Sequence, residues 1–368
     1  MKQIPFYTLA YQNQLIENDV QHFYKELHAD ARYVLGKRVV QFEKEYAAYH
    51  CVKECIGVGN GLDALTLSLR ALNIGKGDEV IVPANSFIAT LLAVTQVGAI
   101  PILAEANFRS FNITAKEIEQ KISSKTKAII PVHLYGLPCE MDKIIALTEK
   151  NNLYIVEDNA QAHGAKYKNQ KTGSFGIINA TSFYPVKPLG AYGDGGAITT
   201  NDEALAKHIR LLGNYGSAEK YYYETTGINS RLDEIQAGVL SIKLNYLDRW
   251  NVERIELAAL YSNLLKNIDG IQTPVHSSDC THIYHQYVIQ TETRNDLQKQ
   301  LIKAGIQTGI HYPVPPHLQK AYDFLNLKKG SLPITEKLSE RILSLPIYIG
   351  MKREDVEYVC EAIQKFYV

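Results

Sequence analysis

Residues 182–196 of the chain read SFYPVKPLGAYGDGG and combine the end of an apolar run, a lysine and a glycine-rich loop. The stretch begins with the hydroxyl of Ser182 and places Lys187 five residues later. Four glycines in its last seven positions let the backbone adopt positive φ angles and lie close to a ligand. A lysine in this setting is either a solvated surface residue or a buried amine whose lowered pKa lets it attack a carbonyl group. The stretch alone leaves both interpretations open.

The segments around this stretch, from about residue 54 to residue 200, alternate short β-branched runs with longer amphipathic runs. This alternation predicts βαβ units, and therefore an α/β fold with a mixed, mostly parallel sheet flanked by helices. The predicted strands are residues 55–58, 79–82, 100–103, 128–132, 154–157, 180–183 and 197–200.

Local sequence signals predict two helix starts and the elements of the second half of the chain. Thr114 and Glu117 form a capping box, and Asn85 or Ser86 is expected to cap the next upstream helix. Beyond residue 230 we predict helices to about residue 250 and from 251 to 265, then a smaller α+β domain. The predicted division is a large domain with an N-terminal arm at residues 1–249 and a small C-terminal domain at residues 250–368.

Composition limits the class of protein. The 39 basic and 39 acidic side chains balance, which removes the electrostatic reason to expect nucleic acid or an anionic membrane as partner. The longest apolar stretch, residues 89–104, is interrupted by polar residues, glycine and proline, so we predict no transmembrane helix. Residues 1–14 lack the apolar core of a signal peptide, and five scattered cysteines are too few to staple the chain. We therefore expect a cytoplasmic protein with reduced thiols.

Two further clusters lie at predicted strand ends, where α/β sheets place their ligands. Residues 57–65, GVGNGLDAL, would bring backbone N–H groups at a helix N-terminus against an anion. Leu62 stands where a dinucleotide fingerprint needs its third glycine, which disfavours an NAD site. Residues 156–165, VEDNAQAHGA, end a strand with Asp158, which could cap a helix, bind a metal or face a protonated heterocycle.

Together, the three clusters supply the parts that a pyridoxal phosphate enzyme needs: a phosphate anchor, a carboxylate for the pyridine nitrogen and a lysine amine. Their order resembles the sugar aminotransferases of the DegT/DnrJ type, a branch of the aspartate-aminotransferase fold, also called fold type I of the PLP transferases. The resemblance covers essentially the whole chain. It is closest to the aminotransferases of nucleotide-linked 3-keto-6-deoxyhexoses, and it implies pyridoxal 5′-phosphate (PLP) as cofactor.

The resemblance implies a role for each matched residue. Lys187 would bind the cofactor covalently and move the substrate proton, and Asp158 would keep the pyridine nitrogen protonated. The other matched cofactor contacts are Gly61, Leu62, Asp63, Phe87, Gln161, Ser182 and Asn229. Asn229 would reach the cofactor of a second subunit, which implies a homodimer with its active site at the interface; it could also cap a helix. The matched substrate contacts are Tyr184, His311, Tyr312 and His317.

Two positions depart from the family's pattern and leave the reacting groups in place. Asn159 stands where alanine is usual, and Pro188 stands where asparagine is usual. Relatives that dehydrate sugars carry histidine at the lysine position, so Lys187 favours amino transfer. A cluster of Cys280, His282 and His285 could suggest zinc, but its alternation is typical of a strand face, and we expect no metal site.

The implied activity is transfer of an amino group from L-glutamate to a nucleotide-linked keto sugar. The leading interpretation is conversion of a dTDP-3-keto-6-deoxyhexose to a dTDP-3-amino-3,6-dideoxyhexose. A 4-keto sugar is the alternative acceptor, because both reactions need the same cofactor groups. A non-catalytic, PLP-binding regulatory protein is the alternative from another functional class.

Overall fold

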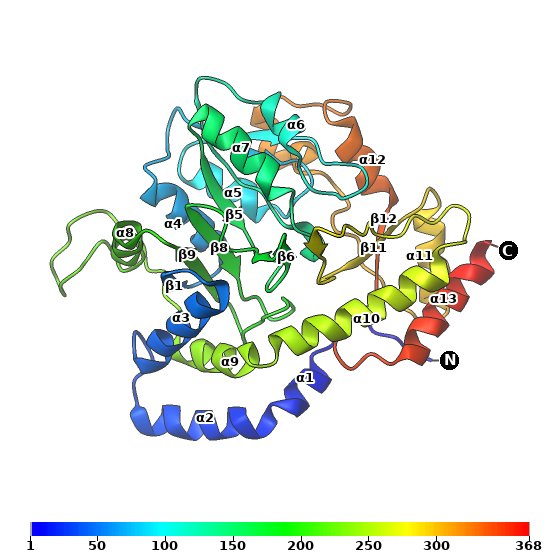
Figure 1. Cartoon of the computed structure of the whole chain (residues 1–368), viewed down its shortest axis with the longest axis horizontal. Coiled ribbons are helices and arrows are strands. Elements are labelled where there is room, and N and C mark those ends of the chain that lie inside the picture. Colours follow the sequence, from blue (N-terminus) through cyan, green and yellow to red (C-terminus); the bar gives the residue numbers. More distant parts are fainter. Residues whose placement is uncertain (1, 368) are drawn as a thin grey trace.

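A seven-stranded sheet forms the centre of the protein, whose computed structural model describes residues 2–367 (Figure 1). In spatial order its strands are β1 (Glu54–Val58), β9 (Gly196–Thr200), β8 (Ile178–Ser182), β5 (Tyr154–Asp158), β4 (Thr126–Ile129), β2 (Glu79–Pro83) and β3 (Ile100–Ala104). The pairs from β3 through β2, β4 and β5 to β8 are parallel, whereas β9 runs antiparallel to both β8 and β1. The predicted α/β class and all seven predicted strands are therefore confirmed, with small shifts at the strand ends.

Helices cover both faces of this sheet, which is why its strands are apolar on both sides. Side chains alternate between the faces: Val80 and Val82 point into one core, and Ile81 points into the other. The first face packs on α4 (Gly61–Ala71), α5 (Ala89–Gln96) and α8 (Glu203–Gly213). The second face packs on α3 (Lys37–His50), α6 (Ala115–Glu119), α7 (Met141–Asn151) and α9 (Glu234–Leu244).

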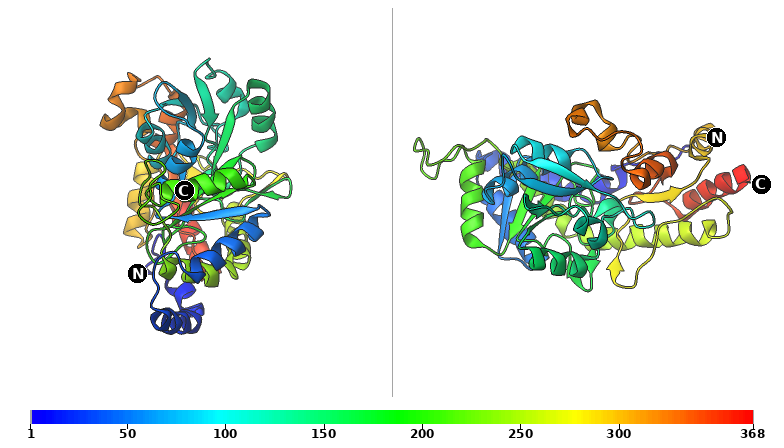
Figure 2. Two further views of the ribbon diagram at one scale, coloured as in Figure 1. Left: turned by 90° about the vertical axis from the view of Figure 1, so that its left-hand side faces the viewer. Right: turned by 90° about the horizontal axis from the view of Figure 1, so that it is seen from above.

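The C-terminal part has a core of its own. The helix α10 (Leu247–Leu265) runs from the sheet toward this part, as Figure 1 and the right-hand view of Figure 2 show. The remaining elements are α1 (Ala10–Leu15), α2 (Glu17–Asp30), β6 (Lys166–Tyr167), β7 (Gln170–Lys171), β10 (Cys280–Thr281), β11 (Tyr287–Gln290), α11 (Arg294–Lys303), α12 (Pro333–Arg341), β12 (Ile342–Leu345), α13 (Arg353–Tyr367) and the short 3-10 turns η1 (Leu134–Gly136), η2 (Pro316–Leu318) and η3 (Lys320–Leu325). Ile4 packs in the same C-terminal core and bridges Ile306, so the N-terminal segment joins the C-terminal part.

Two local predictions were wrong. The break between the two long helices comes at residues 245–246, not at 250, so the predicted domain boundary falls inside α10; the division into two domains itself stays a prediction. Thr114 caps α6 as expected, but α5 begins at Ala89 without a side-chain cap. Ser86 instead uses its hydroxyl to contact Thr90.

The helix pair α3 and α9 is joined by one buried carboxylate. Glu234 accepts hydrogen bonds from the backbone N–H groups of Gly36, Arg38 and Val39, at 2.7, 3.0 and 3.0 Å. These are amides at the start of α3, which have no partner inside their own helix. A Cβ atom at Gly36 would lie 2.7 Å from a Glu234 oxygen, so the contact also requires glycine.

Within residues 2–367, no helix combines the length and apolar character needed to cross a lipid bilayer.

Replacing the carboxylate tests this joint. We expect Glu234→Ala to lower the free energy of unfolding by about 1–3 kcal/mol, because buried N–H donors lose their acceptor. Urea unfolding followed by circular dichroism measures the change. Glu361→Ala is the matched control, since its exposed carboxylate only approaches Lys365 to 4.0 Å and should change stability by about 0.5 kcal/mol at most. Equal stability of the two variants would contradict the assignment.

Candidate active site

A cavity of about 540 Å³ opens at the carboxyl ends of β5 and β8. The structure brings together in its lining ten of the predicted site residues, namely Gly61, Leu62, Phe87, Asp158, Gln161, Ser182, Tyr184, Lys187, His311 and Tyr312. Asp63, Asn229 and His317 do not line it. The cavity therefore combines groups from both halves of the sequence at one edge of the sheet.

Lys187 lies in a tight turn directly after β8. Its backbone N–H donates to the Tyr184 carbonyl at 2.8 Å. The turn also requires glycine at position 190, because a Cβ atom there would lie 2.1 Å from the Pro185 carbonyl oxygen. Burial lowers the pKa of the Lys187 amine to about 8, while the negative charge of Asp158 acts in the opposite direction. Within residues 2–367, burial and the charge of Asp158 are the influences on this pKa, and no hydrogen bond is among them. The amine is therefore available as a nucleophile inside the cavity.

The lysine loop is held from behind by α9. Lys243 donates from Nζ to the Gly190 carbonyl at 2.7 Å, and its ammonium lies 4.4 Å from the centre of the Tyr192 ring. Gln236, also on α9, accepts a hydrogen bond from the Tyr192 N–H at 2.8 Å. Burial lowers the pKa of Lys243 to about 8. Sequence analysis missed this contact, and the only available signal was a lysine within an apolar helix.

Asp158 ends β5 and is 6% exposed. Its two carboxylate oxygens accept hydrogen bonds at 3.1 Å each, one from the Ala160 N–H and one from the Thr90 hydroxyl. Burial raises the pKa of the carboxyl group, and these bonds and the charge of Lys187 oppose that effect. The arrangement holds a carboxylate in a fixed orientation at the cavity wall.

The N-terminus of α4 faces the same cavity. The N–H groups of Gly61 and Leu62 find no acceptor among residues 2–367, whereas the Asp63 N–H donates to the Asn60 side chain at 2.9 Å. A Cβ atom at Gly61 would lie 2.5 Å from Cβ of Ser182, so only glycine allows this helix start to reach the end of β8. Two free amides, the helix dipole and the Ser182 hydroxyl fit a phosphate group. The chemistry of the cavity therefore fits PLP.

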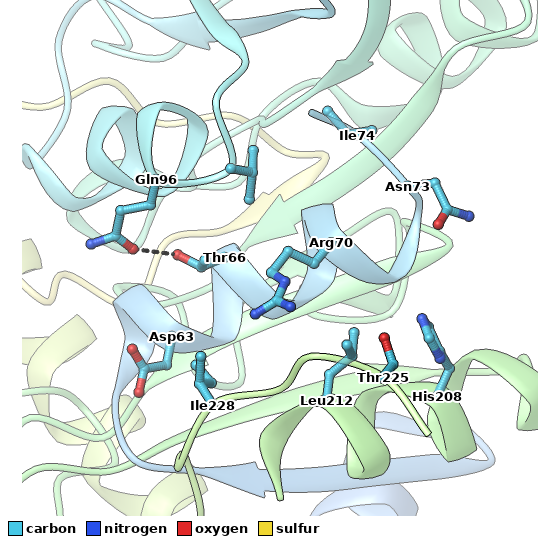
Figure 3. A pocket seen from close by; sticks show the side chains of 11 residues that line it. Asp63, Thr66, Arg70, Asn73, Ile74, Gln96, His208, Leu212, Thr225 and Ile228 are labelled. Carbon is cyan, nitrogen blue, oxygen red and sulfur yellow. Dashed lines mark hydrogen bonds between the residues drawn. The ribbon is translucent and has the colours of Figure 1, made fainter. Parts of the chain in front are cut away.

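The predicted role of Asp63 changes in this arrangement. Its carboxylate accepts a hydrogen bond from the Ser230 hydroxyl at 2.6 Å. It lines a second surface depression together with Arg70 and His208 (Figure 3), where Thr66 and Gln96 form the hydrogen bond that is drawn. Asp63 thus fixes the segment around Ser230 to α4 and offers no free amide to a phosphate.

Two other predicted contacts also lie outside the cavity. Asn229 is exposed and bridges Asn214 in the backbone. The His317 ring is buried, and its Nε2 lies 3.0 Å from Glu336. The structure of one chain therefore gives no support to His317 as a substrate contact, because its ring is enclosed away from the cavity.

Aromatic and amide side chains form the rest of the wall. The centres of the Phe87 and Tyr312 rings are 5.7 Å apart, and Gln161 Nε2 lies 3.4 Å from the Tyr312 hydroxyl. His311 Nδ1 lies 2.8 Å from the Ser344 hydroxyl, and its ring stacks on Phe6. Burial lowers the pKa of His311 to about 4, so this imidazole is neutral at pH 7.

Several residues of the site were missed by sequence reasoning. His285, weighed only as a zinc ligand, lines the cavity with the neighbouring Gln286, and burial lowers the pKa of its imidazole. Ser86 and Thr90 also line the cavity; they lie on either side of the start of α5, and the structure shows that their hydroxyls meet. The side chain of Asn159 is buried outside the lining, so this departure from the family's pattern does not reach the cavity.

The buried Lys243 amine predicts a pH dependence of stability. Above a pH of about 8, its pKa makes it neutral in the folded chain, whereas the unfolded chain keeps the proton until its ordinary pKa of 10.5. The unfolded state then binds more protons, so the free energy of unfolding rises with pH. We expect Lys243→Met to reduce the slope between pH 8 and pH 10 by about 1 kcal/mol per pH unit.

Denaturant titrations at several pH values measure these slopes. Lys365→Met is the control, because its side chain is 79% exposed and should leave the slope unchanged. An unchanged slope in Lys243→Met as well would show that the amine is not held in a buried environment.

The sequence and the fold both match proteins that are already described. The profile of the DegT/DnrJ/EryC1/StrS aminotransferase family matches residues 14–364. The chain is 48% identical to the dTDP-3-amino-3,6-dideoxy-alpha-D-galactopyranose transaminase of Aneurinibacillus thermoaerophilus, with 99% of each chain covered. It is 44% identical to the erythromycin biosynthesis sensory transduction protein EryC1 of Saccharopolyspora erythraea, covering 98% of this chain and 99% of that one.

Solved structures of similar proteins share the whole fold. DesV of S. venezuelae superposes with a TM-score of 0.98 at 42% identity, covering 100% of this chain and 99% of DesV. NtdA of Bacillus subtilis, solved with bound cofactor PMP, superposes with a TM-score of 0.90 at 32% identity, covering 99% of this chain and 85% of NtdA. The family profile spans nearly the whole chain and ten of the predicted site residues line one cavity, so the protein belongs to the DegT/DnrJ/EryC1/StrS aminotransferase family.

Proposed function

We propose that the protein transfers an amino group from L-glutamate to a nucleotide-linked keto sugar, with PLP bound in the cavity. The observation that carries the proposal is the placement of a lysine amine with a lowered pKa, a buried carboxylate and two free helix amides around one cavity. A dTDP-3-keto-6-deoxyhexose is the proposed acceptor, and the similarity to a transaminase named for a dTDP-3-amino-3,6-dideoxy sugar supports it.

Each group in the cavity has a defined task in this proposal. The bound cofactor supplies a reactive carbonyl carbon and a ring that can accept an electron pair. Lys187 would provide the amine that holds the cofactor; once the substrate amine has displaced it, Lys187 would take the proton from the substrate carbon and deliver it to the former carbonyl carbon of the cofactor. Asp158 keeps a proton on the ring nitrogen, because its fixed carboxylate accepts that hydrogen bond. Gly61 and Leu62 donate their amides to the phosphate.

The mouth of the cavity suits a sugar nucleotide. Tyr184, three residues before Lys187, is 53% exposed and lines the cavity. His311 and Tyr312, from the C-terminal part of the chain, line it as well. Because His311 is neutral, we propose that it hydrogen-bonds sugar hydroxyls and does not form an ion pair with the diphosphate. Tyr184 and Tyr312 would offer flat surfaces and hydroxyl groups to the sugar.

We further propose a cytoplasmic homodimer with the active site at the subunit interface. The segment after α8 projects from the body of the molecule (Figure 1). It carries Tyr221, Tyr222 and Tyr223, which are 74%, 68% and 64% exposed. A run of exposed aromatic rings is typical of an interaction surface. Asn229 follows on the same segment, and in a dimer it would be free to reach the partner's phosphate site.

A 4-keto sugar remains the alternative acceptor, because the residues around Lys187 serve either position. Incubating the enzyme with glutamate and each dTDP-keto sugar, followed by NMR of the amino product, distinguishes the two. A regulatory role is the second alternative, since one relative is named a sensory transduction protein. The lowered pKa of Lys187 favours an enzyme over a non-catalytic regulatory protein.

The first experiment is the absorption spectrum of purified protein supplied with PLP. We expect a band of covalently held cofactor that glutamate converts to the amine form of the cofactor. Lys187→Ala should bind PLP without the covalent band and transfer no amino group, while Lys365→Ala should behave as wild type. A protein that binds no PLP, or a fully active Lys187→Ala, would overturn the proposal.

The pKa of Lys187 predicts how capture of PLP depends on pH. Only the neutral amine is a nucleophile, so the rate at which the cofactor-free protein forms the covalent band should rise with pH. The midpoint of the rise should lie near pH 8, where the lowered pKa of Lys187 places it. Stopped-flow absorbance measures this rate. A rate that keeps rising to the pKa of an ordinary lysine would contradict the buried environment.

A further inference from the structure

A chain of two buried hydroxyl groups ends on Asp158. The Ser86 Oγ lies 3.0 Å from the Thr90 Oγ1, which lies 3.1 Å from one carboxylate oxygen of Asp158. Ser86 and Thr90 are 2% and 1% exposed, so water does not compete for these groups. The other carboxylate oxygen of Asp158 accepts from the Ala160 N–H. Both oxygens of the carboxylate are therefore held by protein donors.

The direction of the hydrogen bonds follows from the chemistry of the groups. An ionised carboxylate only accepts, so the single hydroxyl proton of Thr90 points to Asp158. The Thr90 oxygen must then accept the proton of Ser86. The two hydroxyl dipoles align along one line toward the carboxylate, and each strengthens the next in a region of low dielectric.

The backbone around the start of α5 leaves the Ser86 hydroxyl free for Thr90. Ser86 precedes α5 and is expected to cap it, yet the helix begins at Ala89 without a side-chain cap. The Thr90 N–H donates to the carbonyl of Phe87, whose ring lines the cavity. The same short segment therefore delivers the hydroxyl chain to Asp158 and the aromatic ring to the cavity wall.

From this geometry we propose that Thr90 is a positioning residue for amino transfer. It keeps the Asp158 carboxylate ionised and aimed at the ring nitrogen of the cofactor, and Ser86 orients the Thr90 hydroxyl for that task. The inference rests on the proposed function, because it needs Asp158 to face that nitrogen. Thr90 also lines the cavity, but its hydroxyl proton is committed to Asp158, and its effect passes through that carboxylate.

Removing the hydroxyl while keeping the shape tests the inference. Thr90→Val is nearly isosteric, Thr90→Ser keeps the hydroxyl, and Ser86→Ala breaks the chain at its far end. The readout that does not depend on turnover is the 15N NMR shift of PLP labelled at the ring nitrogen and bound to each variant, titrated with pH. We expect the ring nitrogen in Thr90→Val to lose its proton at a pH about one unit lower than in wild type, which corresponds to one hydrogen bond to a charged group.

Kinetics give a second readout. We expect Thr90→Val to lower kcat by about tenfold with little change in the KM for glutamate, because the lost interaction supports the reacting ring and not substrate binding. Thr90→Ser should recover most of the rate and the wild-type titration. Ser86→Ala should shift both readouts in the same direction by a smaller amount, and it covers the case in which Thr90→Val does not fold.

Thr66→Val is the matched control. Its hydroxyl donates to Gln96 at 2.9 Å outside the cavity, so this variant loses a largely buried threonine hydroxyl without touching Asp158. Thermal unfolding compares the stability of the variants. A ring nitrogen that titrates as in wild type in both Thr90→Val and Ser86→Ala would overturn the inference.

Asp158→Asn separates this inference from the proposed function. If Asp158→Asn shifts the titration of the ring nitrogen while Thr90→Val does not, only the role of Thr90 fails. If Asp158→Asn also leaves the titration and the rate unchanged, the assignment of Asp158 in the proposed function fails with it.

Discussion

The parallel pairing of β5 with β8 is the constraint on which the site depends. Asp158 is in register with Ala180, so the carboxylate at the end of β5 lies beside the strand that leads into the Lys187 loop. Parallel strands end at the same edge of a sheet, and loops from distant parts of the sequence therefore meet there. The antiparallel β9 returns the chain from the lysine loop and pairs with β1, which leads into the amides of α4.

Bringing a lysine and a carboxylate into one buried region costs desolvation energy, and the fold offsets this cost in different ways. The carboxylate of Asp158 is compensated by two donors, the Ala160 amide and the Thr90 hydroxyl. The amine of Lys187 has only the charge of Asp158 in its favour, so its pKa falls to about 8. The loop that carries it is fixed through the backbone, by Lys243 on the carbonyl of Gly190. The result is a rigid frame around a reactive amine.

The fold and most of the cavity could be predicted from sequence because their signals are local. Alternating β-branched runs gave the strands, and the cap at Thr114 was correct. The predicted cap of α5 failed, because Ser86 uses its hydroxyl on Thr90. Asp63 and His317 stay predictions as ligand contacts, although the Asp63 N–H donates to Asn60 and the His317 ring is enclosed with Glu336. The sequence does not report a contact such as that of His317 with Glu336, because the two residues meet only in the folded chain.

By itself, the sequence determined the α/β class, the order of the motifs and the family, because periodicity and short spacings are written along the chain. The tertiary structure alone decided which groups meet. It placed Thr90 on Asp158 and Lys243 behind the lysine loop. The physical reason is that hydrogen bonding and desolvation act over a few ångströms in space, whatever the separation of the residues in sequence.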